Sequence, residues 1–171
     1  ASTLALASCG AGEAPEAAPV GPIRPLKALA PFPVGTVAMS GQLSDQDWFQ
    51  LVSTHFSQLT PEWEMKMEYI LANGLDRPNF DRTDRIAAFA RAEGMAMHGH
   101  TLIWYAQGNE AFAGLSGAGF DRAFDGYIAT VAGRYRGKVR SWDVVNEPIL
   151  DDGSGMRDCH WSARYGQDGY I

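Results

Sequence analysis

The feature that most constrains the fold of this chain is a regular alternation of strand-like and helix-like segments from residue 31 onward. Short apolar runs, typical of strands, alternate with stretches in which apolar residues recur at helical spacing. Such an alternation predicts parallel strands joined by crossover helices. The expected strands are residues 34–40, 56–60, 95–104 and 139–146.

Three helices are expected between these strands. The first begins with Ser44 and Asp47, whose spacing resembles a capping box. The second opens at Asp81 and stops at Gly94, and the third stops at Gly137. The apolar or aromatic residues at helical spacing are, in chain order, Trp48, Leu51, Val52 and His55; Ile86, Phe89 and Ala90; and Phe120, Phe124, Tyr127, Ile128, Val131 and Tyr135.

Two architectures are compatible with four successive βα units. One is an α/β fold of the (β/α)8 TIM-barrel type, of which four units are half. The other is an open doubly wound sheet, which usually carries a glycine-rich phosphate loop after its first strand. The residues at that point, Ser40-Gly41-Gln42-Leu43, do not match such a loop. The sequence therefore favours the first four βα units of a TIM barrel, and no nucleotide site is predicted.

Composition narrows the function classes. The chain has 171 residues, 46% of them hydrophobic, enough for one sizeable core. A net charge of −6 makes nucleic acid an unsuitable partner, since phosphate binding needs a basic face. No apolar run approaches the roughly 18 residues that span a bilayer. Neither a CxxC nor an HExxH pattern is present, so no metal site and no cofactor are predicted.

The N-terminal residues differ in composition from the rest. Residues 1–20 are rich in Ala, Gly, Ser and Pro and contain no aromatic residue. The run Leu6-Ala7-Ser8-Cys9 resembles the lipobox of a bacterial lipoprotein signal, and a chance cysteine in a disordered tail is the alternative. We interpret residues 1–27 as a signal remnant and flexible tether, and residues 28–171 as the folded part. This interpretation predicts export, with Cys9 carrying lipid in a periplasmic or outer-membrane lipoprotein, or secretion.

Polar and aromatic residues gather after three of the four expected strands. The three segments are Thr60-Pro61-Glu62-Trp63-Glu64-Met65-Lys66, residues 98–107, and Asp143-Val144-Val145-Asn146-Glu147-Pro148. The carboxyl ends of parallel strands lie at one edge of the sheet, where barrels and open sheets have their catalytic and ligand-binding residues. Carboxylate, imidazole and amide groups beside indoles suit a carbohydrate, because sugar hydroxyls need hydrogen-bond partners and a pyranose face packs on an aromatic ring.

These three segments, in this order, resemble the signature blocks of glycoside hydrolase family 10. Members of that family are retaining endo-1,4-β-xylanases with a (β/α)8 barrel. The resemblance covers residues 31–171 and corresponds to the first half of the barrel. It implies a xylan or xylo-oligosaccharide substrate and a monomeric full-length protein. The chain lacks an initial Met and ends in a helix-like segment, so we expect it to be a fragment of that protein.

The resemblance also implies roles for individual residues. By this resemblance, Glu147 matches the acid/base of the family. A retaining glycosidase needs one carboxylic acid to protonate the leaving oxygen and a second carboxylate as nucleophile. The nucleophile of the family lies in a later Thr-Glu block, which this sequence does not contain. Asn146 matches the residue that bonds a sugar hydroxyl beside the scissile bond. The other implied substrate-binding residues are Glu62, Lys66, His100, Trp104 and Gln107.

Two positions depart from the family pattern. Trp63 stands where most members have Asn, and Tyr105 stands where they often have His. Either change can alter affinity or substrate preference. A barrel glycosidase acting on another β-linked glycan is one alternative, because Asn-Glu at the end of the fourth strand recurs in such enzymes. A non-catalytic sugar-binding barrel is another, because the second carboxylate is not in this sequence. Trp142 and Asp143 are expected to support the site by packing. His98 is expected to face the helices or to support the site from behind.

Overall fold

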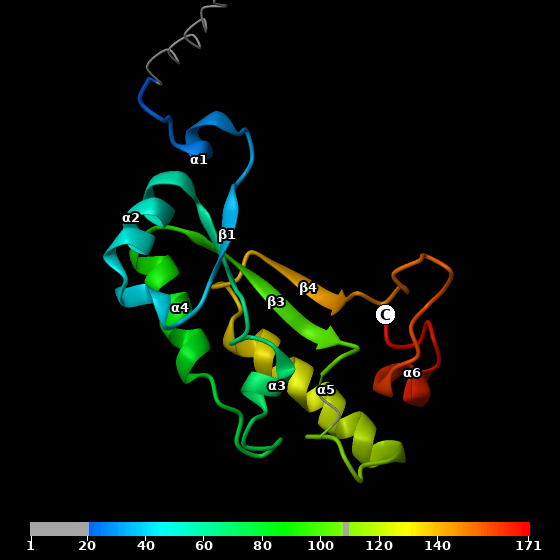
Figure 1. The fold of residues 1–171 in the computed structure, drawn as a ribbon. Helices are drawn as coiled ribbons and strands as arrows, with labels where there is room; N and C mark the ends of the chain where they lie inside the picture. The colour runs from blue at the N-terminus through cyan, green and yellow to red at the C-terminus, as the bar shows by residue number, and fades with distance from the viewer. Residues whose placement is uncertain (1–20, 108–109) are drawn as a thin grey trace, which may run out of the picture.

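The computed structural model describes residues 21–107 and 110–171. The predicted lipobox and Cys9 lie outside the described residues, and the lipid anchor stays a prediction. Four strands form one sheet: β1 (Gly35–Ala38), β2 (Gln58–Pro61), β3 (Ala96–Trp104) and β4 (Ser141–Asn146) (Figure 1).

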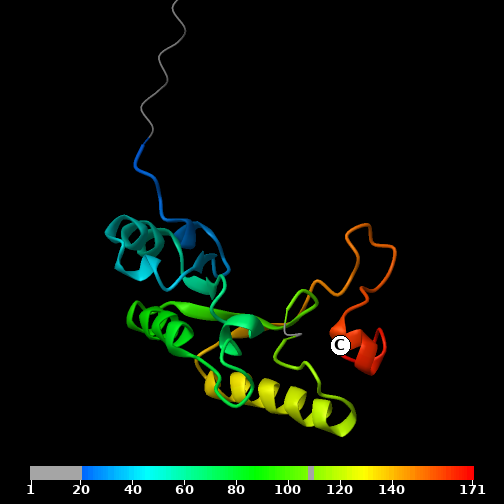
Figure 2. The same ribbon diagram turned by 60° about the horizontal axis from the view of Figure 1, so that its bottom comes forward.

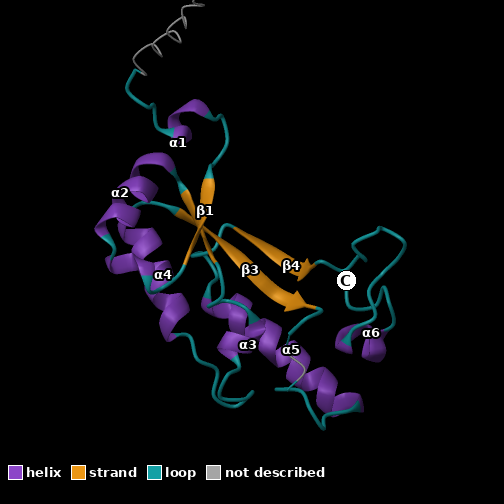
Figure 3. Ribbon diagram, in the orientation of Figure 1, coloured by secondary structure: helices purple, strands orange, loops and turns teal. Residues whose placement is uncertain are grey.

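The strands are parallel and lie in chain order, β1-β2-β3-β4. A doubly wound sheet reverses its strand order at a switch point. No such reversal occurs among these four strands, whereas successive units of a barrel give this order. All four carboxyl ends consequently lie at one edge, as the arrowheads in Figure 3 show for β3 and β4.

The helices predicted from periodicity are present as α2 (Gln46–His55), α4 (Asp81–Ala92) and α5 (Gly117–Arg134). Figure 2 shows α4 and α5 on one side of β3. Strand residues on that side are buried, such as Leu59 and Met97, while their neighbours Thr60 and His98 are half-exposed on the other side. The core therefore lies between the sheet and these helices, and the opposite face of the sheet is open.

The start of α2 differs from the prediction. Its N-cap is Asp45, whose carboxylate accepts hydrogen bonds from the backbone N–H of Asp47 at 2.9 Å and of Trp48 at 3.1 Å. Ser44 instead ends a short 3-10 turn, η1 (Gln42–Ser44). Aspartate is as good a cap as serine, and Asp45 is the residue directly before the helix. Leu51 is exposed, whereas Val52 carries the burial of this helix.

Three short helices have no periodic signature. They are α1 (Leu26–Leu29), α3 (Met67–Ile70) and α6 (His160–Tyr165). Each is too short for a repeat of apolar positions to show in the sequence. No helix in the described part of the chain is long and apolar enough to cross a membrane.

Candidate active site

The candidate site is built on the carboxyl ends of β2, β3 and β4. In the ladder between β3 and β4, His100 lies opposite Asp143 and Trp104 lies opposite Asn146, with a shift of register between these two pairs. The register thus places the polar end of β3 directly beside that of β4. Sequence spacing alone predicted that these residues share an edge, and the pairing shows which of them are neighbours.

Glu147 follows the last residue of β4 and turns sharply out of the strand. Its φ of 52° lies in the left-handed region, which non-glycine residues rarely adopt. The strand thus ends at Asn146, as it must if two consecutive side chains are to reach the same pocket. The indole Nε1 of Trp104 donates a hydrogen bond to Glu147 Oε2 at 2.8 Å. One oxygen of the exposed Glu147 carboxylate is therefore oriented by β3.

Lys66 is held between two indole rings. Its Nζ lies 4.1 Å from the centroid of the Trp63 ring and 4.9 Å from that of Trp104. The Lys66 side chain is only 6% exposed, so it is not an extended surface lysine. A cation between aromatic faces is stabilised by both ring quadrupoles. Lys66 thereby joins the end of β2 to the Trp104–Glu147 pair, and Trp63 supports it.

His100 belongs to a cluster around Asp143. His100 Nδ1 lies 2.8 Å from Asp143 Oδ2, and His98 Nε2 lies 3.1 Å from the same oxygen. Burial raises the pKa of Asp143, but the hydrogen bonds to His100 and His98 outweigh it, and the net pKa is lowered. Asp143 is therefore a carboxylate at neutral pH and supports His100, as predicted.

Of the two alternatives predicted for His98, facing the helices is wrong, and supporting the site is confirmed by its contact with Asp143. Residues two apart on a strand point to the same face, so His98 lies on the same side as His100. Both line a hollow of about 440 Å³ on the open face of the sheet, together with Glu62 and Asp143. The other nitrogen of His98, Nδ1, lies 2.8 Å from Ser141 Oγ. Glu62 is thus close to the histidine cluster.

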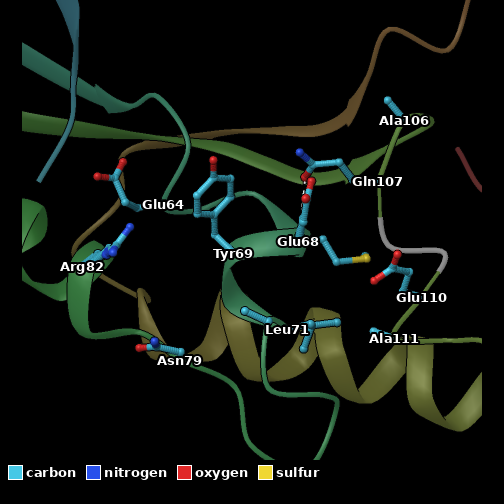
Figure 4. Close-up of a pocket in the computed structure, with 12 residues that line it drawn as sticks. Glu64, Glu68, Tyr69, Leu71, Asn79, Arg82, Ala106, Gln107, Glu110 and Ala111 are labelled. Carbon is cyan, nitrogen blue, oxygen red and sulfur yellow. Dashed lines mark hydrogen bonds between the residues drawn. The ribbon is translucent and has the colours of Figure 1, made fainter.

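Gln107 lines a cavity that does not include Glu147. This cavity has a volume of about 800 Å³ and is shown in Figure 4. Gln107 is buried there, and its Oε1 accepts a hydrogen bond from the backbone N–H of Glu68 at 3.4 Å. Neither Trp104 nor Asn146 is among the residues that line this cavity. Among the predicted site residues, Gln107 alone lines this cavity, although its backbone N–H donates to the Trp104 carbonyl at 3.3 Å.

Two residues with structural roles at the site were not predicted. Glu64 is 5% exposed, and its Oε1 accepts a hydrogen bond from the backbone N–H of Ser40 at 2.6 Å, which ties the β2 end to the β1 end. Arg157 donates from Nε to the backbone carbonyl of Glu147 at 3.1 Å. Glu64 could have been noticed in the segment around Glu62, whereas Arg157 comes ten residues after Glu147 in a loop without a pattern.

No group of three or more His, Cys, Asp or Glu side chains suited to a metal ion occurs within residues 21–107 and 110–171. The groups that are present are carboxylates, imidazoles, an ammonium and indoles at the carboxyl ends of parallel strands. That combination and placement are typical of a carbohydrate-active enzyme built from βα units.

Comparisons with known proteins identify the family. Residues 26–171 match the family model described as glycosyl hydrolase family 10, and the chain belongs to that family. It is 34% identical over 162 residues to endo-1,4-beta-xylanase A of Cellvibrio japonicus, covering 85% of this chain and 26% of the relative. The crystal structure of CbXyn10B superposes with a TM-score of 0.78 at 31% identity, covering 85% of this chain and 46% of that one.

A second solved relative carries a ligand. It is a mutant in complex with xylotriose, with a TM-score of 0.74 and 33% identity, covering 82% of this chain and 44% of that chain. The chain described here thus spans less than half the length of the solved relatives. Its four parallel strands are the first four βα units of the TIM barrel of the family, as predicted.

Proposed function

We propose that this chain is the first half of a retaining endo-1,4-β-xylanase in which Glu147 is the general acid/base. The observation that carries the proposal is the position of Glu147. It leaves β4 in a left-handed conformation and its carboxylate is bonded by Trp104, whose ring also contacts the Lys66 ammonium. The names of the relatives, and the xylotriose bound to one of them, support xylan as the substrate class.

The geometry suits proton transfer from one defined oxygen. Because Trp104 Nε1 donates to Oε2, the proton of the neutral acid is carried by Oε1. In the first step, Glu147 gives this proton to the glycosidic oxygen while a second carboxylate attacks the anomeric carbon, and the C–O bond to the leaving sugar breaks. In the second step, Glu147 takes a proton from water, whose oxygen displaces the enzyme carboxylate.

The neighbouring groups supply sugar contacts in this proposal. His100 and Lys66 offer hydrogen-bond donors to hydroxyls, and Asn146 offers an amide beside the scissile bond. Trp63 places an exposed indole at the end of β2, where the family pattern has a short amide. We therefore expect this end of the site to hold a sugar by stacking rather than by the amide hydrogen bond.

The test is Glu147→Ala in the full-length protein that carries this chain. We expect the hydrolysis of xylan to be abolished, because its leaving group needs a proton. The first step on aryl xylosides with good leaving groups should fall less, since these depart without protonation. Glu93→Ala, at an exposed glutamate following α4, is the matched control and should keep wild-type rates.

Wild-type rates on xylan in Glu147→Ala would overturn the acid/base role. Faster turnover of another β-linked glycan than of xylan by the unmodified protein would overturn the substrate class. Binding of xylo-oligosaccharides without turnover of any glycan would point to a sugar-binding barrel instead of an enzyme.

A further inference from the structure

The segment between β4 and α6 folds back on itself and returns Arg157 to the end of β4. Ile149 and Met156 form an antiparallel bridge. The backbone N–H of Leu150 donates to the carbonyl of Gly155 at 2.9 Å, and the N–H of Arg157 donates to the carbonyl of Pro148 at 2.8 Å. Arg157 is therefore a fixed neighbour of Glu147 in space, although ten residues separate them in the sequence.

The Arg157 side chain makes three contacts of different kinds. Its Nε donates to the backbone carbonyl of Glu147 at 3.1 Å. Its guanidinium carbon lies 4.3 Å from the centroid of the Tyr105 ring, and its Nη2 pairs with the Asp151 carboxylate. The Arg157 side chain is 13% exposed and that of Asp151 is 93% exposed, so the ion pair is open to solvent and the other two contacts are sheltered.

The backbone of Glu147 has an unfavourable conformation that contacts such as those of Arg157 must hold in place. Among the described residues Glu147 is the only non-glycine residue with a positive φ, a conformation that costs on the order of 1 kcal/mol or more and persists only where its surroundings hold it. Arg157 fixes its backbone carbonyl and Trp104 fixes its carboxylate. The Trp104 backbone is itself anchored, because its carbonyl accepts a hydrogen bond from Trp161 Nε1 of α6 at 3.2 Å.

We propose that Arg157, stacked on Tyr105, is a positioning residue that holds the strained backbone of Glu147 and so aims its carboxyl group. This inference rests on the proposed acid/base role of Glu147. Tyr105 suits the task, because the face of a neutral phenol attracts a guanidinium whereas a protonated imidazole repels it. A displacement of about 1 Å at a catalytic group can lower a rate on the order of 100-fold.

The test variant is Arg157→Lys in the full-length protein. Lysine keeps the charge but has neither the Nε donor nor the planar group that stacks on Tyr105. We expect kcat to fall on the order of 100-fold on xylan and on aryl xylosides with poor leaving groups, with little change in KM. On aryl xylosides with good leaving groups we expect kcat/KM, which reports the first step alone, to fall only a few-fold, because that cleavage does not need the proton of Glu147.

The matched control is Arg164→Lys. Arg164 also pairs with an aspartate, Asp121, but it lies in α6 and makes no contact with Glu147. It should leave both rates unchanged. An equal loss of kcat/KM on good and poor leaving groups in Arg157→Lys would show a general structural role and overturn the proposal, as would the absence of any loss.

A second measurement separates this inference from the proposed function. The indole N–H resonance of Trp104 reports its hydrogen bond to Glu147 and can be assigned by its disappearance in Trp104→Phe. We expect it to move upfield in Arg157→Lys and to stay in place in Arg164→Lys. If the unmodified protein cleaves no glycan, the proposed function fails, whereas an unmoved Trp104 resonance in Arg157→Lys overturns the positioning role by itself.

Discussion

Gly99 lies in β3 opposite Trp142 of β4, and the indole ring covers the position that a side chain would occupy. A Cβ added at Gly99 would meet ring atoms of Trp142 at 2.2, 2.5 and 2.6 Å. These distances are far shorter than a van der Waals contact. A rigid indole ring packed against the strand cannot move aside as the end of a flexible side chain can. Only glycine therefore allows the two strand ends that carry His100 and Asp143 to pair with Trp142 between them.

We accordingly expect Gly99→Ala to lower the free energy of unfolding by about 1–3 kcal/mol, the usual cost of overpacking. The midpoint of urea-induced unfolding measures it. Gly126→Ala is the matched control. Gly126 lies within α5 with nothing within 4 Å of the added Cβ, so this substitution should stabilise the helix by up to about 1 kcal/mol. A Gly99→Ala variant as stable as the wild type would contradict the packing described here.

Individual residues also show how far sequence reasoning reached. The motifs predicted that Glu147, Trp104 and Lys66 would lie at one edge of the sheet, because each follows a strand and parallel strands have their carboxyl ends at the same edge. They could not predict the Lys66–Trp63 contact, which depends on how the β2 end folds after the strand. They could not predict Arg157 either, since a loop that returns on itself leaves no periodic trace. The alternative that His98 faces the helices was wrong because residues two apart on a strand point to the same face, whereas its supporting role was predicted.

At the scale of elements, α4 and α5 are joined by a polar contact at the edge of the core. Asp84 of α4 accepts hydrogen bonds from Arg134 Nε at 3.1 Å and from the Tyr135 hydroxyl at 3.0 Å. The hydrogen bond with Arg134 lowers the pKa of Asp84; burial opposes this and Tyr135 adds to it. Periodicity predicted both helices, but it carries no information about which charged residues face each other between them.

The lowered pKa of Asp84 makes this contact depend on pH in one direction. An unfolded Asp titrates near pH 3.9, so the contact stabilises the fold fully above about pH 4 and is lost as the pH falls through the lower folded pKa. We expect Asp84→Asn to lower the thermal midpoint at pH 7 by an amount equivalent to about 1 kcal/mol or less, because the pair is partly exposed.

The difference between Asp84→Asn and the wild type should shrink below about pH 4. Thermal unfolding followed by circular dichroism from pH 3 to pH 7 measures it. Asp76→Asn, at an exposed aspartate in the loop before α4, is the control and should follow the wild type throughout. A constant difference across this pH range would show that charge pairing at Asp84 contributes nothing.

At the scale of the whole molecule, the sheet has two free edges and one open face. Among the residues that the structure describes, β1 pairs only with β2 and β4 only with β3. Val37 and Val144, on these outer strands, are each about half exposed. Unpaired strand edges and exposed apolar side chains favour association with other chains. The order of the strands was predictable from the alternation of segments, whereas the closure of a barrel needs partners for both edges.

We therefore expect the 171-residue chain by itself to show no turnover of xylan and to associate as its concentration rises. Retaining hydrolysis needs a nucleophilic carboxylate about 5–5.5 Å from the acid/base, and the family's Thr-Glu block is not in this sequence. Weak affinity for xylo-oligosaccharides should remain through Trp104, His100 and Lys66. The measurements are reducing-sugar release by the purified chain and its sedimentation at several concentrations. Turnover that follows the chain through purification and disappears in Glu147→Ala would show that these four βα units suffice for catalysis.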